Sequence, residues 1–322
     1  MAARTESYAP TIVELRQIRG ADIHDLLVEE TAVWRETLDW DFRPSAALVR
    51  RFLDIQALSG YALLMGGRVA GYSYFVAEER KGLIGDLYVR NEFATPQTEG
   101  RLLASVLEGM VKSPFVHRVE SQLMMLRNGS RIALPYWRYL KVHARNFMEI
   151  DLSAALNLPA GGAARSIAVE NWSERHQDEA AQLIANAYQG HIDSEINDQY
   201  RSAAGARRFL MNIVQYPGCG AFYQPASFVA IDPRSGHLAG ICLSSLVADD
   251  IGHITQVCVS KAARGRGIGY ELLRRSLESL EHNRCCRASL TVTAANKAAI
   301  RVYDRMGFRK RREFAAYVWD GF

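Results

Sequence analysis

This sequence lacks the features that mark membrane-spanning, secreted and nucleic-acid-binding proteins. No apolar run approaches the length that crosses a bilayer, and residues 1–7 lack the apolar core of a secretory signal. The net charge of +4 is too small to indicate a nucleic-acid partner. Cysteine is scarce, and its five residues show no Cys-x-x-Cys spacing, which fits reduced thiols. We therefore expect a cytoplasmic protein with no nucleic-acid partner, no membrane partner and no metal.

A glycine-rich loop is the most informative stretch that the chain does contain. Gly265, Gly267 and Gly269 follow an alternating apolar stretch, typical of a strand, and precede apolar residues at helical spacing. Glycines let backbone N–H groups approach a ligand, and a helix N-terminus favours an anion. The loop has neither the Gly-x-Gly-x-x-Gly register nor a Gly-Lys-Ser/Thr sequence. It predicts a cradle for a pyrophosphate group.

A second motif follows this loop. Residues 296–308 have the pattern Asn-x-x-Ala-x-x-x-Tyr-x-x-x-Gly-Phe, and the loop has the spacing Arg264-x-x-Gly267-x-Gly269. Together the two motifs resemble the acyl-CoA loop and the next helix of the GCN5-related N-acetyltransferase (GNAT) family. The resemblance implies an N-acetyltransferase that transfers an acetyl group from acetyl-CoA to a primary amine.

The resemblance also implies a role for each matching residue. In that family the strand end pairs with the pantetheine arm, the loop contacts the pyrophosphate, and the cap of the next helix also contacts the cofactor. The matching cofactor-binding residues are Val257, Cys258, Val259, Arg264, Gly265, Arg266, Gly267, Ile268, Gly269 and Asn296. Tyr303 matches the tyrosine that protonates or hydrogen-bonds the departing thiolate and is the expected catalytic residue.

The chain repeats one plan twice. Residues 67–71 echo residues 236–240, and residues 87–89 echo residues 257–259 at nearly the same offset. A short uncharged segment between the copies has the composition of a linker. The expected parts are a degenerate domain at 1–155, a linker at 156–164 and an acyl-CoA-binding catalytic domain at 165–322.

The first copy lacks the chemistry of the loop. Thr95, Gln97 and Glu99 take the positions of the three glycines, and Pro96 takes the position of Arg266. Proline has no N–H group to donate, and Glu99 adds a carboxylate where a phosphate would bind. We therefore expect the first copy to keep the scaffold without binding acyl-CoA in this way.

Hydrophobic periodicity predicts a mixed α/β (α+β) fold in both copies, with a largely antiparallel sheet flanked by helices. This order of elements resembles a tandem GNAT fold. Trp34 and Leu38 are expected to face inward from a helix, and Ser45 is expected to cap the next one. A further helix is expected at residues 132–140, in the position that residues 297–306 take in the second copy.

The general base stays open. Many GNAT relatives carry a carboxylate on the strand before the loop or on the following strand, whereas this sequence has Thr255, Gln256 and Thr291 there. None of these side chains accepts a proton at neutral pH. A bound water is one candidate, and the others are His191, His253, Asp249 and Asp250.

The sequence gives little information about the substrate that accepts the acetyl group. In this fold the segment between the first two helices walls the acceptor side, and here it is residues 188–200, whose tyrosines and carboxylates suit a cationic amine. We expect a small-molecule amine. A protein or peptide N-acetyltransferase and a non-enzymatic acyl-CoA-binding module stay open as alternatives. The first copy is expected to close the acceptor pocket or to form the surface of a homodimer.

Overall fold

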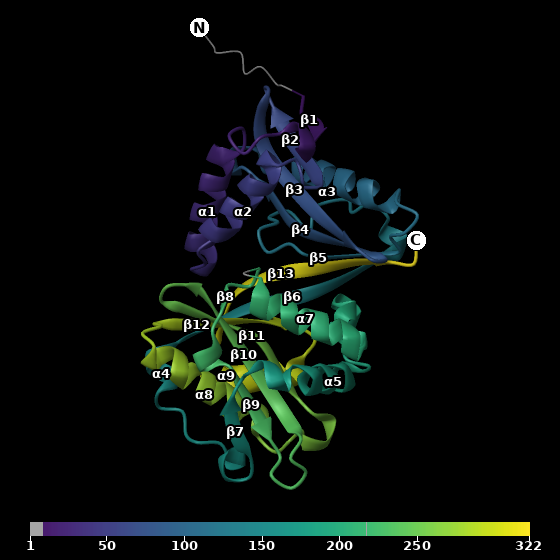
Figure 1. Cartoon of the computed structure of the whole chain (residues 1–322). Coiled ribbons are helices and arrows are strands. Elements are labelled where there is room, and N and C mark those ends of the chain that lie inside the picture. The colour runs from purple at the N-terminus through teal and green to yellow at the C-terminus, as the bar shows by residue number, and fades with distance from the viewer. Residues whose placement is uncertain (1–8, 217) are drawn as a thin grey trace. The chain divides into compact units, whose positions relative to one another are not determined.

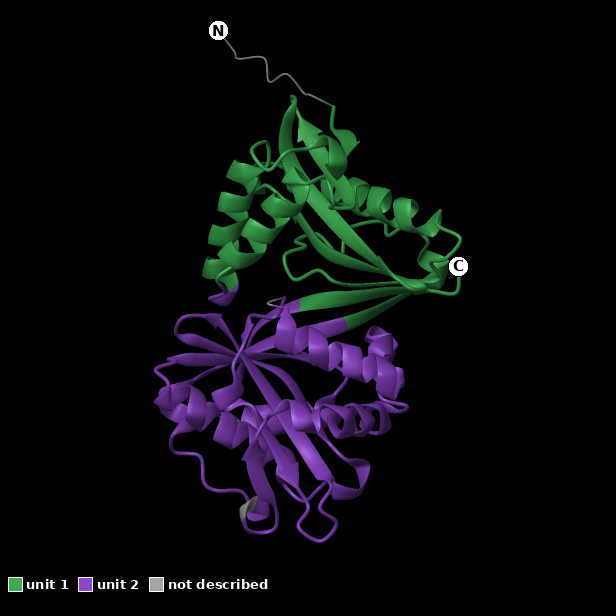
Figure 2. Ribbon diagram, in the orientation of Figure 1, with its two compact units in different colours: residues 1–37, 41–143, 314–322 green, residues 38–40, 144–313 purple. Residues whose placement is uncertain are grey.

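The computed structural model describes residues 9–216 and 218–322, which divide into two compact units (Figures 1 and 2). Unit 1 contains the described residues up to Thr37, with Asp41–His143 and Phe314–Phe322. Unit 2 contains Leu38–Trp40 and Ala144–Glu313. These units differ from the predicted division at 155 and 165, because the last strand of each sequence repeat contributes to the unit of the other repeat.

Unit 1 is one sheet with α1 and α2 on one face and α3 on the other (Figure 1). The strand order is β1-β2-β3-β4-β5-β13, and only the β4–β5 pairing is parallel. As predicted, Trp34 and Leu38 of α1 are buried. The elements are β1 (Thr11–Glu14), α1 (His24–Leu38), α2 (Arg43–Asp54), β2 (Gly60–Met65), β3 (Arg68–Glu78), β4 (Lys81–Val89), α3 (Pro96–Val111), β5 (Arg118–Gln122) and the end of β13 (Arg309–Asp320).

Unit 2 repeats this plan with the strand order β7-β9-β10-β11-β12-β6. Helix α8 packs its leucines into one core of the unit, while α5 and α7 bury theirs in another. The helical elements are α4 (Leu152–Ala155), α5 (Gln177–Tyr188), α6 (Asp193–Ile196), α7 (Ala203–Gln215), α8 (Ile268–His282) and α9 (Lys297–Met306). The strands are β6 (Leu140–Asp151), β7 (Ala168–Asn171), β8 (Ala221–Phe222), β9 (Phe228–Ile231), β10 (Leu238–Ala248), β11 (Ile251–Val259) and β12 (Arg287–Thr293).

The two parallel strands at the centre of unit 2 stay paired over only part of their length. Pairing of β11 with β12 ends at Ile254 and Leu290, although β11 continues to Val259 and β12 to Thr293. On its other edge β12 stays paired with β6 as far as Thr293. One edge of the end of β11 is therefore left without a neighbouring strand in the described chain.

The mixed, largely antiparallel α/β fold is confirmed, while two local predictions were wrong. Residues 132–140 form no α-helix, because Pro135 cannot donate a helical hydrogen bond and Tyr136 has a left-handed φ of +54°. Ser45 lies inside α2, which begins at Arg43 after an N-cap at Phe42. No described helix is both long and apolar enough to span a bilayer.

Candidate functional site

The glycine loop leads into the open N-terminus of α8. Gly265 and Gly267 have φ of +77° and +81°, a left-handed conformation that side chains with a Cβ rarely adopt. Gly267 is the N-cap of α8, and a Cβ on Gly265 would meet no atom within 4 Å. No N–H group from residue 265 to 270 has an acceptor among the described residues. Free N–H groups at the N-terminus of a helix, together with the helix dipole, are the kind of group that binds an anion.

Basic side chains anchor the loop to the rest of unit 2. Lys261 and Arg264 donate to two backbone carbonyl groups at the C-terminal end of α5, at 3.1 and 2.7 Å. A cation is favoured there because the helix C-terminus is partially negative. Arg266 pairs with Asp232 at 3.1 Å. Since both arginines have protein partners, the backbone amides are the main donors that the loop offers to a ligand.

The predicted linker is hydrogen-bonded to the helix that follows this loop. The N–H group of Gly161 donates to the carboxylate of Glu271 in α8 at 2.9 Å. Burial raises the pKa of Glu271, but hydrogen bonds from Arg274, Arg275 and Gly161 outweigh burial and lower that pKa to about 2. Glu271 is therefore an ionised, buried group that ties the linker to the helix carrying the cradle.

The end of β11 lies beside the cradle. Val257, Cys258 and Val259 pair with β10 on one edge, and their other edge has no strand partner among the described residues. An extended ligand can pair with such an edge as an added strand. Burial raises the pKa of the Cys258 thiol to about 12, so this cysteine is a small core side chain and no nucleophile at neutral pH.

Helix α9 supplies the next two predicted site residues. Asn296 is its N-cap, as predicted, and its Oδ1 accepts the N–H group of Ala299 at 3.2 Å. Tyr303 is 6% exposed and packs against Phe308 with ring centroids 5.8 Å apart. Burial raises the pKa of Tyr303, so the phenol keeps its proton at neutral pH. Its hydroxyl has no hydrogen-bond partner among the described residues and is free to donate.

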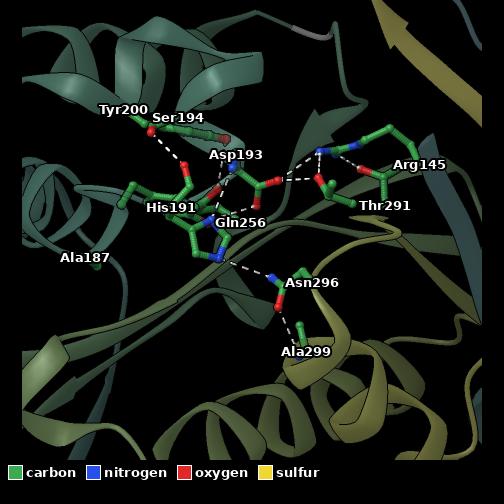
Figure 3. Close-up of polar contacts among 12 residues, drawn as sticks. Arg145, Ala187, His191, Asp193, Ser194, Tyr200, Gln256, Thr291, Asn296 and Ala299 are labelled. Carbon is green, nitrogen blue, oxygen red and sulfur yellow. Dashed lines mark hydrogen bonds and ion pairs between the residues drawn. The ribbon is translucent and has the colours of Figure 1, made fainter. Parts of the chain in front are cut away.

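A polar cluster joins the segment 188–200 to β6 and β12 (Figure 3). Nη1 of Arg145 lies 3.4 Å from Asp193 and 2.9 Å from the hydroxyl of Thr293, and Nη2 lies 3.0 Å from the hydroxyl of Thr291. Thr293 also donates to Asp193. The sequence did not predict Arg145 as part of this cluster. The pairing of β6 with β12 brings Arg145 to the cluster, and no local sequence pattern indicates that pairing.

The strand position that often carries a base is occupied by an amide held by two tyrosines. Nε2 of Gln256 donates to the hydroxyl of Tyr188 at 3.0 Å, and the hydroxyl of Tyr200 donates to Oε1 at 3.4 Å. The two tyrosine rings stack with centroids 4.4 Å apart. Gln256 is thus a structural tie between β11 and the segment 188–200.

Three of the four side chains considered as a base lie away from the cradle. His253 is enclosed between Trp40 and Phe147, and burial lowers its pKa to about 4. Asp249 and Asp250 form the turn at the opposite end of β11 from the cradle. The fourth, His191, joins the polar cluster of Figure 3. In the described ranges, no three His, Cys, Asp or Glu side chains gather as a metal site would require.

In unit 1 the position of the cradle is occupied by the chain itself. Thr95 forms a capping box with Thr98 at the start of α3. The carboxylate of Glu99, which is 2% exposed, accepts the backbone N–H groups of Arg127 and Asn128 at 3.2 and 3.0 Å. Two amides of the same unit therefore bind the carboxylate at the position where unit 2 has a glycine.

Comparison with known proteins places these features in context. Residues 192–308 match the Acetyltransferase (GNAT) family. A mycothiol acetyltransferase of Mycobacterium sp. (strain JLS) is 36% identical over 103 residues, which cover 30% of this chain and 34% of that protein. The chain thus spans about a third of the length of this curated relative.

Solved structures resemble the whole chain in fold. A GCN5-related N-acetyltransferase from Sphaerobacter thermophilus has a TM-score of 0.67 at 17% identity and covers 97% of this chain and 95% of its own. A tandem GNAT protein from the clavulanic acid biosynthesis pathway has a TM-score of 0.66 at 17% identity, with 98% and 99% covered. At this identity the likeness establishes the two-domain fold.

Proposed function

We propose that this chain, which belongs to the GNAT family of acetyltransferases and has its tandem two-domain arrangement, transfers an acetyl group from acetyl-CoA to a primary amine of a small molecule. The observation that carries the proposal is the open cradle of unit 2, where free backbone N–H groups converge at the N-terminus of α8. A pyrophosphate is an anion of the kind that such a helix end binds.

Different residues of unit 2 bind acetyl-CoA and assist the transfer of its acetyl group. Amides of residues 265–270 hold the pyrophosphate, and the free edge of residues 257–259 pairs with the extended pantetheine arm. Holding the thioester beside the amine makes the reaction effectively unimolecular. Tyr303, buried and still protonated, donates its proton to the departing thiolate. The amine nitrogen bonds to the carbonyl carbon as the carbon–sulfur bond breaks, and the proton that the nitrogen loses passes to solvent, from which Tyr303 is protonated again.

A small-molecule acceptor fits the segment 188–200. The segment carries the stacked rings of Tyr188 and Tyr200. Besides Asp193, which pairs with Arg145, it also carries the carboxylates of Glu195 and Asp198. These are the groups that attract an ammonium ion. The similarity to a mycothiol acetyltransferase also favours a small acceptor over a protein.

The test is release of free thiol from acetyl-CoA in the presence of a panel of amines. We expect release that depends on the amine, with small amines better than peptides. A calorimetric titration with acetyl-CoA should give one site per chain, because Glu99 occupies the corresponding place in unit 1. Peptide N-termini as the sole acceptors would point to a protein acetyltransferase, and binding without transfer to any amine would point to a binding module.

A further inference from the structure

Two side chains in unit 2 present hydrogen-bond donors to one another with no acceptor between them. Asn296 uses Oδ1 to accept the N–H group of Ala299, so its Nδ2 amino group is left as a donor. That Nδ2 lies 3.5 Å from Nε2 of His191 (Figure 3). Two donors at this distance do not bond to each other unless one of them gives up its proton.

The contacts of His191 place a proton on Nε2. Nδ1 accepts the backbone N–H group of Asp193 at 3.2 Å, so in the neutral ring the single proton is on Nε2. In the charged ring both nitrogens carry protons, and Nδ1 lies 3.6 Å from the carboxylate of Asp193. Nε2 is therefore a donor in both states, and this geometry does not suit the role of a base.

The ring is fixed in this orientation and still reachable. Asp193, which engages Nδ1, is itself held by Arg145 and Thr293. The ring of Tyr188 meets the imidazole edge-on, with centroids 5.2 Å apart and planes at 89°. The side chain of His191 remains 27% exposed. Nε2 and the amide of Asn296 are thus preorganised at the junction of the segment 188–200 and the N-terminus of α9.

We infer that Nε2 of His191 and Nδ2 of Asn296 form a two-donor site for one oxygen of a bound ligand, of carbonyl or carboxylate type. Such an oxygen has two lone pairs and can accept both N–H groups at once. This inference rests on the proposed function, in which two ligands reach unit 2. The oxygen belongs either to the acceptor amine substrate or to an amide carbonyl of the pantetheine arm of acetyl-CoA.

The experiment compares variants that remove one donor while keeping the surroundings. His191→Phe keeps a ring without an N–H group, and His191→Gln restores an amide donor. Asn296→Asp keeps the helix cap, because aspartate caps as well as asparagine, but replaces the donor by an acceptor. His282→Phe is the matched control, since His282 is 66% exposed at the far end of α8. Thermal melting without ligand establishes that each variant is folded.

Two constants are measured for each protein, namely the calorimetric Kd of acetyl-CoA and the KM of the best amine. We expect His191→Phe and Asn296→Asp to raise the same constant about five- to tenfold, the usual effect of losing one hydrogen bond. His191→Gln should recover part of the loss, and His282→Phe should match wild type. A rise in Kd assigns the oxygen to acetyl-CoA, and a rise in KM alone assigns it to the acceptor.

The inference is overturned if His191→Phe and Asn296→Asp each leave the Kd of acetyl-CoA and the KM of the amine unchanged. It is also overturned if His191→Phe loses turnover with both constants unchanged, since that pattern belongs to a base. Failure of wild type to acetylate any amine refutes the proposed function separately. In that case the Kd alone decides, and an unchanged Kd in His191→Phe and Asn296→Asp rejects the two-donor site.

Discussion

The guanidinium group of Arg145 lies 3.4 Å from the carboxylate of Asp193, although the sequence repeat assigns the two residues to different copies of the fold. Arg145 is on β6, the last strand of the first copy, and β6 pairs with β12 of the second copy. The side chains are only 12% and 16% exposed. A residue of the degenerate copy thus holds the segment 188–200 of unit 2 in place.

Arg145→Ala should loosen that segment without disturbing the cradle. We expect the KM of the amine to rise while the Kd of acetyl-CoA stays near wild type. The free energy of unfolding should fall by roughly 1–3 kcal/mol, the range for losing a charged hydrogen bond that is mostly shielded from water. Steady-state kinetics, calorimetry and urea unfolding measure the three quantities.

Glu149→Gln is the matched control for Arg145→Ala. Glu149 lies on the same strand and pairs with Arg311 at 2.7 Å, so its loss also breaks an ion pair on β6. It makes no contact with the segment 188–200 in the described structure. Equal effects of both substitutions on the KM of the amine would mean that Arg145 acts only through the stability of the strand.

Gly269→Glu should reproduce in unit 2 the carboxylate that Glu99 supplies in unit 1. Gly269 lacks the positive φ of the other two loop glycines, and a Cβ there would meet only Val259, at 3.4 Å. The carboxylate near the N-terminus of α8 favours the helix by roughly 0.3–1 kcal/mol but repels a pyrophosphate. We expect a melting temperature near that of wild type, with no increase when acetyl-CoA is added.

Gly269→Gln separates the charge from the volume of the new side chain and should retain part of the ligand-induced shift. Gly267→Asp is less informative, because φ at Gly267 is +81° and any side chain there is strained. A full acetyl-CoA shift in Gly269→Glu would place the pyrophosphate elsewhere.

Tyr303→Phe removes a hydroxyl group while leaving the buried ring in its packing. Proton transfer from one side chain typically contributes about a hundredfold or more to the rate. We therefore expect turnover to fall by about that factor, with the Kd of acetyl-CoA little changed. If the variant keeps wild-type turnover across the pH range, Tyr303 serves only in packing.

Unit 1 should show a pH-dependent stability from a buried carboxyl pair. Burial raises the pKa of Glu30 well above its usual range, with the nearby charge of Asp86 adding to the effect, and burial also raises the pKa of Asp86. Glu30 accepts hydrogen bonds from Tyr72 and Trp34 at 2.9 and 3.3 Å.

The direction of this pH dependence follows from how many protons the folded and unfolded states bind. A raised folded-state pKa means that the folded protein holds protons that the unfolded chain releases above about pH 4. The pair's contribution to stability is therefore full below that pH and is lost as the pH rises through the folded-state values. Asp86→Asn should melt higher than wild type at pH 7, and the difference should shrink toward pH 4. A difference that grows on acidification would contradict this linkage.

The sequence by itself was enough to predict the glycine loop, the helix that follows it and the capping asparagine. These features are local: the alternation of a strand, three glycines and a helical apolar spacing lie within about thirty residues of one another. The sequence also predicts that the first copy lacks this loop chemistry. With Thr95, Pro96 and Glu99 in place of the loop residues, that copy cannot present the same free amides. The repeat predicted a helix at 132–140, but Pro135 cannot donate a helical hydrogen bond, and no α-helix forms there.

Only the tertiary structure decided the contacts between residues that are far apart in the chain. The exchange of β6 and β13 between the units depends on which strand edges meet, and strand pairing leaves no periodic mark in either sequence segment. For the same reason Arg145 reaches Asp193, and His191 faces Asn296 across 105 residues. The protonated nitrogen of His191 follows from a backbone N–H group in its own turn, a detail of geometry that residue types do not specify.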